Sequence, residues 1–240
     1  MATEQLDIHA LAAYLHLTPQ QVQRMADRGR IPGRKVGGQW RFNEAEIHSW
    51  LEERIGASDD PEHLDKMQAV VDRWSHAQDS PPHVARLLHP DAVEVPLQAR
   101  TKGAVIRRMC ELAERTGLLW DAQRMAEAVA AREELMPTAL EGGVALLHPR
   151  RPQPSILGGP FLALGVSPQP IPFGNIDGHL TDIFFLICST DDRVHLRVLT
   201  RLSRLISATP LLSQLRAATE AKEIVRAVEE NEQLLDQGQT

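Results

Sequence analysis

A histidine at the end of a short apolar segment is the residue of this chain best placed to do chemistry. Residues Val144–Leu147 are apolar, and His148 follows them directly, ahead of Pro149. The apolar run predicts a buried strand, and a strand end is where a sheet offers side chains to an incoming molecule. A neutral imidazole there is nucleophilic, and Arg150 and Arg151 attract an anion. The alternative interpretation is a histidine that merely terminates a strand.

The residues around His148 form a pattern. Arg132 and a glutamate are followed by Thr138, then by the Gly142-Gly143 pair, and then by Val-Ala-x-x-His148. This order resembles enzyme IIA of the fructose/mannitol class of the bacterial sugar phosphotransferase system, including its nitrogen-regulatory branch. Further matching pieces extend the resemblance over roughly residues 84–235. They are Ile171–Gly174 before Asp177-Gly178, the strand from Thr181 to Cys188, and the segment from Asp191 to Leu205.

The resemblance implies an α/β fold with a mixed sheet flanked by helices, and phosphoryl transfer to a histidine from the phosphocarrier HPr or a homologue. His148 matches the acceptor. His195 matches a second histidine that donates a hydrogen bond to a phosphoryl oxygen, and Arg132 matches an arginine that steadies the charge. Because the transition state of phosphoryl transfer is loose, catalysis rests on positioning and charge stabilisation. Purely structural roles are the alternatives. His195 could be a core histidine whose hydrogen bonds are satisfied, and Arg132 could belong to a structural ion pair.

One departure from the family falls at the acceptor itself. The family usually has Pro-His-Gly, whereas this chain has Leu147-His148-Pro149. Proline has no backbone N–H, so any phosphate contact through that amide is lost. Arg150 and Arg151 could compensate electrostatically, and a domain that senses without phosphotransfer remains an alternative.

The elements that must position these residues follow from caps and periodicity. Thr101 and Asp121 each predict a helix start, and Arg132 extends the apolar stripe of the second helix. In the helix expected from Asp191 to Ser207, His195 falls on the buried face. The remaining expectations are strands at 161–166 and 182–188, a proline-rich turn at 167–172, a short helix through Leu215 and a last helix from Glu220 to Leu235.

The first part of the chain carries a second pattern. Ile8, Leu11, Ala12 and Leu15 mark one helical face, and Thr18-Pro19-Gln20-Gln21 is a capping box with proline at the first helical position. A Gly-Gly hairpin at 34–42 and a helix after Asn43 follow. Residues 5 to 56 resemble the excisionase and MerR-like winged helix-turn-helix. By this resemblance Gln20, Gln23 and Arg24 are candidate base readers, and the candidate phosphate contacts are Arg28, Arg34, Lys35 and Arg41.

Charge and composition limit the function classes. The chain of 240 residues has a formal net charge of -6, yet residues 24–41 hold six basic side chains against one acidic one. That asymmetry favours a local anionic partner, DNA, over a solvated protein-binding module. The start of the chain lacks a secretion signal and no apolar run can span a bilayer, so we expect a cytoplasmic protein without membrane insertion. Cys110 and Cys188 form no disulfide or metal pattern, and we expect no metal and no cofactor.

The predicted organisation has three parts: a DNA-binding winged helix-turn-helix at 1–56, a helical linker at 57–82, and an enzyme-IIA-like domain at 83–240. A linker helix at 62–77 could pair two chains as a homodimer or pack on the next domain. The sequence favours a DNA-binding regulator phosphorylated at His148. The alternatives are an enzyme IIA component serving a sugar permease and a non-phosphorylated interaction protein.

Overall fold

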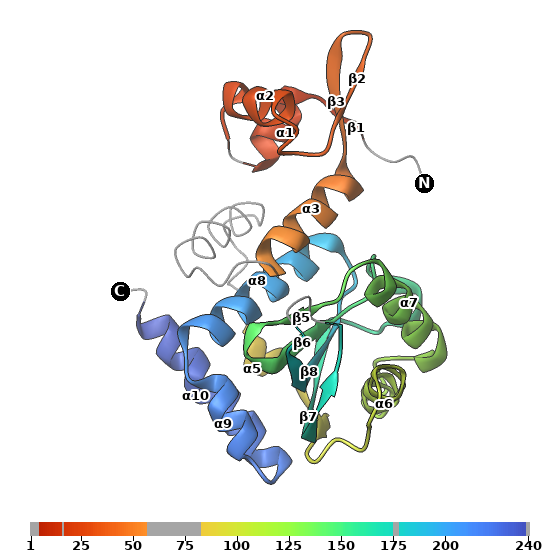
Figure 1. Cartoon of the computed structure of the whole chain (residues 1–240), viewed down its shortest axis with the longest axis vertical. Helices are drawn as coiled ribbons and strands as arrows, with labels where there is room; N and C mark the ends of the chain where they lie inside the picture. Colours follow the sequence, from red (N-terminus) through yellow and green to blue (C-terminus); the bar gives the residue numbers. More distant parts are fainter. Residues whose placement is uncertain (1–4, 16, 57–82, 175–177, 239–240) are drawn as a thin grey trace.

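The computed structural model describes residues 5–15, 17–56, 83–174 and 178–238, arranged as a small N-terminal unit above a larger C-terminal one (Figure 1). The predicted linker and its pairing helix at 62–77 lie outside these described residues. The elements of the N-terminal unit are β1 (Gln5–Leu6), α1 (Ile8–Leu15), α2 (Pro19–Asp27), β2 (Arg34–Val36), β3 (Gln39–Asn43) and α3 (Glu44–Gly56).

Local signals in the sequence explain the N-terminal unit. The Thr18 side chain accepts from the backbone N–H of Gln21, and the Gln21 side chain returns the bond, as the capping box predicts. Strands β2 and β3 form the expected hairpin, with positive φ at Gly37 and Gly38 in its turn. The helix-turn-helix prediction is therefore confirmed in its elements, and β1 adds a third strand beside β3.

The C-terminal unit is built on a mixed sheet of five strands in the order β4-β7-β8-β6-β5. Pairs β4/β7 and β6/β8 are parallel, whereas β7/β8 and β5/β6 are antiparallel. Its elements are α5 (Val84–Leu87), β4 (Leu88–Glu94), α6 (Lys102–Glu114), α7 (Ala122–Leu135), β5 (Ala139–Leu140), η1 (Glu141–Gly143), β6 (Val144–Leu147), η2 (Pro154–Ile156), β7 (Phe161–Pro172), β8 (Leu180–Cys188), α8 (Asp192–Ala208), α9 (Leu211–Ala217) and α10 (Ala221–Gln237).

Helices cover both faces of this sheet, as expected for the α/β class. Along β6, Val144 and Leu146 pack with α8, α9 and α10, while Ala145 and Leu147 pack with α6 and α7. Strand β8 alternates in the same way. Because successive side chains point to opposite faces, a fully apolar strand serves two cores at once.

One prediction about the chain path is wrong. The proline-rich residues 167–172 do not form a turn, because β7 continues to Pro172. The pairing with β8 shifts register between Val166 and Ile171 and then resumes at Ile171 opposite Thr181. Such a bulge is a place where a strand tolerates prolines that cannot donate to the ladder. Strand β4 was not predicted at all.

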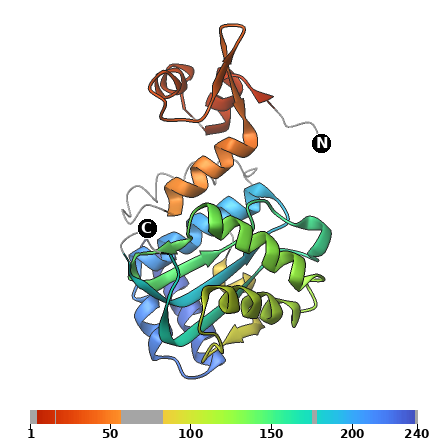
Figure 2. The ribbon, with the colours of Figure 1, turned by 45° about the vertical axis from the view of Figure 1, so that its right-hand side comes forward.

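Helix α3 joins the two units physically. It runs from the N-terminal unit down to the C-terminal one, where it lies along α8 (Figures 1 and 2). The buried apolar residues Ile47, Leu51 and Ile55 of α3 belong to the same hydrophobic cluster as Leu196 and Leu199 of α8. The two units therefore share one continuous apolar core.

Candidate functional site

His148 stands directly after β6, at the strand end that the sequence predicts. Its Nδ1 lies 2.8 Å from the backbone carbonyl oxygen of Leu146. A carbonyl can only accept, so Nδ1 carries the proton and donates it. The neutral ring consequently keeps its lone pair on Nε2, which has no hydrogen-bond partner. The geometry thus prepares Nε2 as the nucleophilic or ligating atom.

His195 lies beside His148, in the first turn of α8. Asp191 caps that helix by accepting from the backbone N–H of Val194, which fixes the turn that carries the ring. The two imidazole centroids are 4.8 Å apart, and Ser189 Oγ lies 3.5 Å from His195 Nδ1. Nε2 of His195 is also without a hydrogen-bond partner. The structure therefore brings the two predicted histidines together.

Arg132 occupies the last turn of α7 and is buried, as its place on the apolar stripe predicts. Its Nη1 donates to the backbone carbonyl of Met136 at 2.7 Å, which holds the guanidinium at the helix end. The adjacent Glu133 accepts from the Thr138 backbone N–H at 3.1 Å and pairs with Lys102 at 2.9 Å. These contacts tie the end of α7 to the segment that enters β5 and β6.

A residue that sequence reasoning missed completes the cluster. Glu52 of α3 reaches from the N-terminal unit, with Oε2 3.8 Å from His148 Nε2 and Oε1 3.5 Å from His195 Nε2. Its side chain is buried. The only signal in the sequence is that His48 and Glu52 stand one turn apart beside the apolar stripe of α3, so both face the surface that the stripe packs against.

His48 makes the second polar contact between the units. Its Nδ1 is 3.2 Å from Asp192 Oδ2 at the start of α8, and its Nε2 meets the hydroxyl of Tyr14 on α1. The His48 contact lowers the pKa of Asp192 more than partial burial raises it. The contact adds a polar link between α3 and α8 to the apolar packing of the two helices.

The surroundings of the histidine pair lower the pKa of Glu52 and the pKa of His195. Burial alone would raise the pKa of Glu52, but His148, His195 and Arg132 together hold that pKa below its usual value, so Glu52 is ionised. Burial, followed by the neighbouring His148, lowers the pKa of His195 to about 4. The His195 ring is therefore neutral near pH 7, beside a carboxylate and a guanidinium.

This depressed pKa makes stability depend on pH. As pH falls below about 6.5, unfolded chains protonate His195 while folded chains do not, so the free energy of unfolding must decline down to about pH 4. We expect a loss of about 2 kcal/mol between pH 6.5 and pH 5, measured by urea unfolding. His195→Gln should reduce this fall in the free energy of unfolding. His89→Gln, which replaces a partly exposed histidine, should leave the fall unchanged. A wild-type free energy of unfolding that stays constant between pH 6.5 and pH 5 would contradict the lowered pKa of His195.

The His148 ring is not open to solvent in this arrangement, contrary to the expectation that a strand end offers its side chain to an incoming molecule. His148 is only 3% exposed, because α3 lies over the histidine pair with Glu52 against both Nε2 atoms. The cover is a helix end bearing a carboxylate rather than packed hydrocarbon alone. Chemistry at Nε2 therefore requires α3 to move away. Arg150 and Arg151, which follow His148 in the chain, stay exposed.

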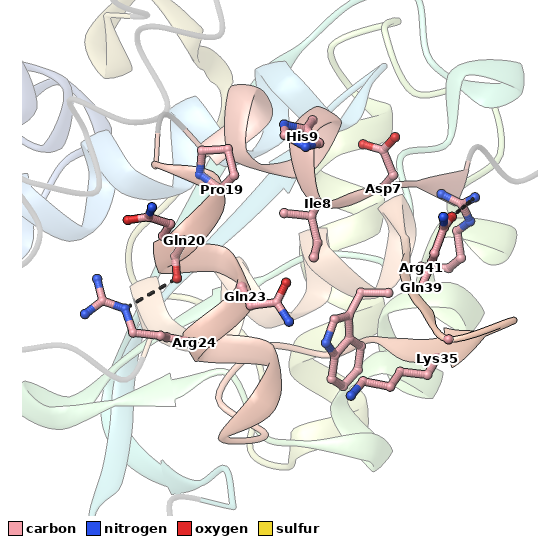
Figure 3. A pocket seen from close by; sticks show the side chains of 12 residues that line it. Asp7, Ile8, His9, Pro19, Gln20, Gln23, Arg24, Lys35, Gln39 and Arg41 are labelled. Carbon is pink, nitrogen blue, oxygen red and sulfur yellow. Dashed lines mark hydrogen bonds between the residues drawn. The ribbon is translucent and has the colours of Figure 1, made fainter.

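The candidate DNA-reading residues gather on a separate groove of about 810 Å³ in the N-terminal unit (Figure 3). Gln20, Gln23 and Arg24 line it from α2, and Lys35 and Arg41 line it from the hairpin. Arg28 and Arg34 are exposed but outside this lining. All the lining residues belong to the N-terminal unit, so docking of α3 leaves the groove accessible.

Comparison with known proteins settles the family. Residues 86–231 match the family described as phosphoenolpyruvate-dependent sugar phosphotransferase system, EIIA 2. The chain belongs to this enzyme IIA family. Residues 6–55 match a helix-turn-helix domain, so an enzyme IIA domain and a helix-turn-helix domain stand in one chain.

Relatives of the enzyme IIA domain fall in both branches that the sequence resembles. A nitrogen regulatory protein of Bradyrhizobium diazoefficiens is 29% identical over 144 residues, which are 59% of this chain and 91% of that protein. The fructose-specific EIIABC component of Bacillus subtilis is 26% identical over 151 residues. That match covers 62% of this chain but only 23% of the EIIABC component.

Solved structures share the fold of the enzyme IIA domain. The nitrogen regulatory protein IIA-Ntr of Neisseria meningitidis aligns with a TM-score of 0.54 and 22% identity, over 60% of this chain and 98% of that one. The mannitol IIA of Escherichia coli aligns with a TM-score of 0.52 and 19% identity, over 58% and 97%. Within the described part of the chain, no helix combines the length and the apolar character needed to cross a bilayer.

Proposed function

We propose that this protein is a DNA-binding regulator whose enzyme IIA domain accepts a phosphoryl group on Nε2 of His148 from an HPr-type phosphocarrier. The single observation that carries the proposal is the contact of Glu52 with both histidines. A helix of the helix-turn-helix domain thereby ends on the proposed acceptor pair, which links the two domains physically. The proposed parts are residues 1–56, 57–82 and 83–240, in a cytoplasmic protein.

The chemistry follows from the fixed tautomer. The lone pair of His148 Nε2 attacks phosphorus while the bond between phosphorus and the nitrogen of the carrier's phosphohistidine breaks. His148 Nδ1 keeps its proton throughout and donates it to the Leu146 carbonyl oxygen. Arg132 and the exposed arginines after Pro149 supply positive charge for the oxygens that become more negative. His195 is neutral and can donate one hydrogen bond to a phosphoryl oxygen. No proton has to leave the ring pair during the transfer.

Phosphorylation and docking of α3 then exclude each other. A phosphoryl group on Nε2 brings a charge of about -1.5 to -2, into the space that the Glu52 carboxylate holds at 3.8 Å from the same atom. Two anions in a buried site repel strongly. The phosphorylated chain therefore releases α3, and the helix-turn-helix domain loses its fixed orientation on the enzyme IIA domain.

The test of this function uses the full chain. Incubation with phosphoenolpyruvate, the first relay enzyme and several HPr-type carriers should add one acid-labile phosphate, mapped by mass spectrometry. Affinity for duplexes selected from random sequence should then differ between the phosphorylated and unphosphorylated forms. If the chain gains no phosphate from any carrier, His148 is not a phosphoryl acceptor. If the phosphorylated chain binds no duplex at low salt, the protein is instead a phosphotransfer component of sugar transport.

The basic groove makes a quantitative prediction about DNA binding. Lys35 stacks over Trp40 at 5.1 Å on the hairpin and is exposed, which suits a phosphate contact. Lys35→Ala should weaken binding to all duplexes alike and make the slope of log affinity against log salt shallower by about one. Lys222→Ala makes the same change on an exposed position of α10 and should leave the slope unaltered. Equal slopes for wild type and Lys35→Ala would remove Lys35 from the interface.

A further inference from the structure

Three potential metal ligands converge where the two domains meet. One ring nitrogen of His148, one ring nitrogen of His195 and a carboxylate oxygen of Glu52 all lie within 4.8 Å of one another. The three side chains are 3%, 3% and 6% exposed, so water cannot satisfy them freely. Both Nε2 atoms lack hydrogen-bond partners. In the described ranges of the chain, this is the only such trio of histidine, cysteine or acidic side chains.

The spacing of these atoms fits a small transition-metal ion. Ligands bound at about 2.0 to 2.1 Å in a tetrahedral zinc site are separated by about 3.3 Å. Glu52 already lies 3.8 Å from the Nε2 of His148 and 3.5 Å from the Nε2 of His195. The three ligand atoms lie within 4.8 Å of one another, so closing the set shortens no ligand–ligand distance by more than about 1.5 Å.

The surroundings also suit imidazole ligation. The Leu146 carbonyl accepts the Nδ1 proton of His148, and Ser189 is within reach of Nδ1 of His195. The Leu146 carbonyl fixes the His148 tautomer that presents Nε2 to a metal, and the Ser189 hydroxyl can accept from Nδ1 of His195 in the same way. The negative charge of Asp192 raises the pKa of His195, and the positive charge of Arg132 lowers it. Asp192 therefore partly offsets the repulsion between Arg132 and a bound cation.

We propose that Glu52, His148 and His195 bind one divalent transition-metal ion of the zinc class, with water at a fourth position. Two imidazoles and one carboxylate suit zinc or cobalt, whereas magnesium and calcium prefer oxygen ligands. The site joins two domains, because one ligand comes from the helix-turn-helix domain and two from the enzyme IIA domain. It requires neither DNA nor phosphate, so it goes beyond the regulator proposed above. The ligands come from three distant segments, which is why their spacing in the sequence gave no metal pattern.

The metal alone is the probe. The full chain is freed of metal with a chelator and titrated with Co²⁺, followed by visible absorption, and with Zn²⁺, followed by calorimetry. We expect one ion per chain and the intense visible bands of four-coordinate cobalt. Glu52→Gln, His148→Gln and His195→Gln should each weaken binding by about tenfold or more, while Glu46→Gln on the exposed side of α3 should not.

No binding, or binding that the three substitutions leave unchanged, overturns the site. If the two histidine variants lose metal affinity and Glu52→Gln does not, then Glu52 is not a ligand and the site does not join the two domains. Circular dichroism in chelator identifies any variant that fails to fold. In that case hydrogen exchange of the wild type decides, because Zn²⁺ should slow exchange of α3 amides and Mg²⁺ should not; equal exchange with both ions counts against the site.

Discussion

Replacing His148 by alanine is expected to abolish phosphoryl acceptance completely. The transfer requires a ring nitrogen with a free lone pair, and the hydrogen bond from Nδ1 to Leu146 leaves that lone pair on Nε2 of His148. Acid-labile phosphate per chain, measured after incubation with the carrier relay, should fall from about one to background.

Two comparisons separate loss of the acceptor from loss of the fold. His89→Ala removes a partly exposed histidine from β4 and should leave the phosphate yield unchanged. His195→Gln keeps the acceptor but removes a neighbouring imidazole, so we expect slower transfer, by about a hundredfold, rather than none. Phosphate retained in a folded His148→Ala protein would place the acceptor elsewhere.

The features that the sequence predicted correctly are those fixed by neighbouring residues. Thr18, Thr101 and Asp121 each cap the helix expected after them, because an N-cap needs only the residues of the next turn. His148 at its strand end and Arg132 at its helix end follow from the same local periodicity. Their approach to His195 does not, and rested on resemblance to a family.

The features that the sequence did not reveal depend on packing between distant segments. Glu52 looks like an ordinary charge on a surface helix, and its role appears only when α3 docks on α8. Prolines near 170 suggested a turn, but pairing of Ile171 with Thr181 keeps the segment in β7. In both cases tertiary contacts override local preference. The missed burial of His148 has the same origin, since the cover comes from the other domain.

Glu52→Gln is expected to increase the rate of phosphorylation at His148 by about tenfold or more. The wild-type carboxylate lies against both Nε2 atoms, and it both covers the acceptor and repels an incoming phosphoryl group. Neutralising it removes the repulsion and weakens docking of α3. A loss of about 1.4 kcal/mol in docking raises the population of open chains tenfold where the closed form dominates.

The measurement must separate release of α3 from a general disturbance of the fold. Initial rates are taken with chelator present, so that bound metal cannot mask the effect, and at a carrier concentration below saturation. Glu46→Gln makes the same chemical change on the exposed side of α3 and should leave the rate unaltered. His48→Gln removes the other polar contact, at 3.2 Å from Asp192, and should accelerate transfer without touching the acceptor pair. Acceleration by both Glu52→Gln and His48→Gln assigns the effect to undocking, whereas slower transfer in Glu52→Gln alone would mean that the carboxylate assists the reaction instead of blocking it.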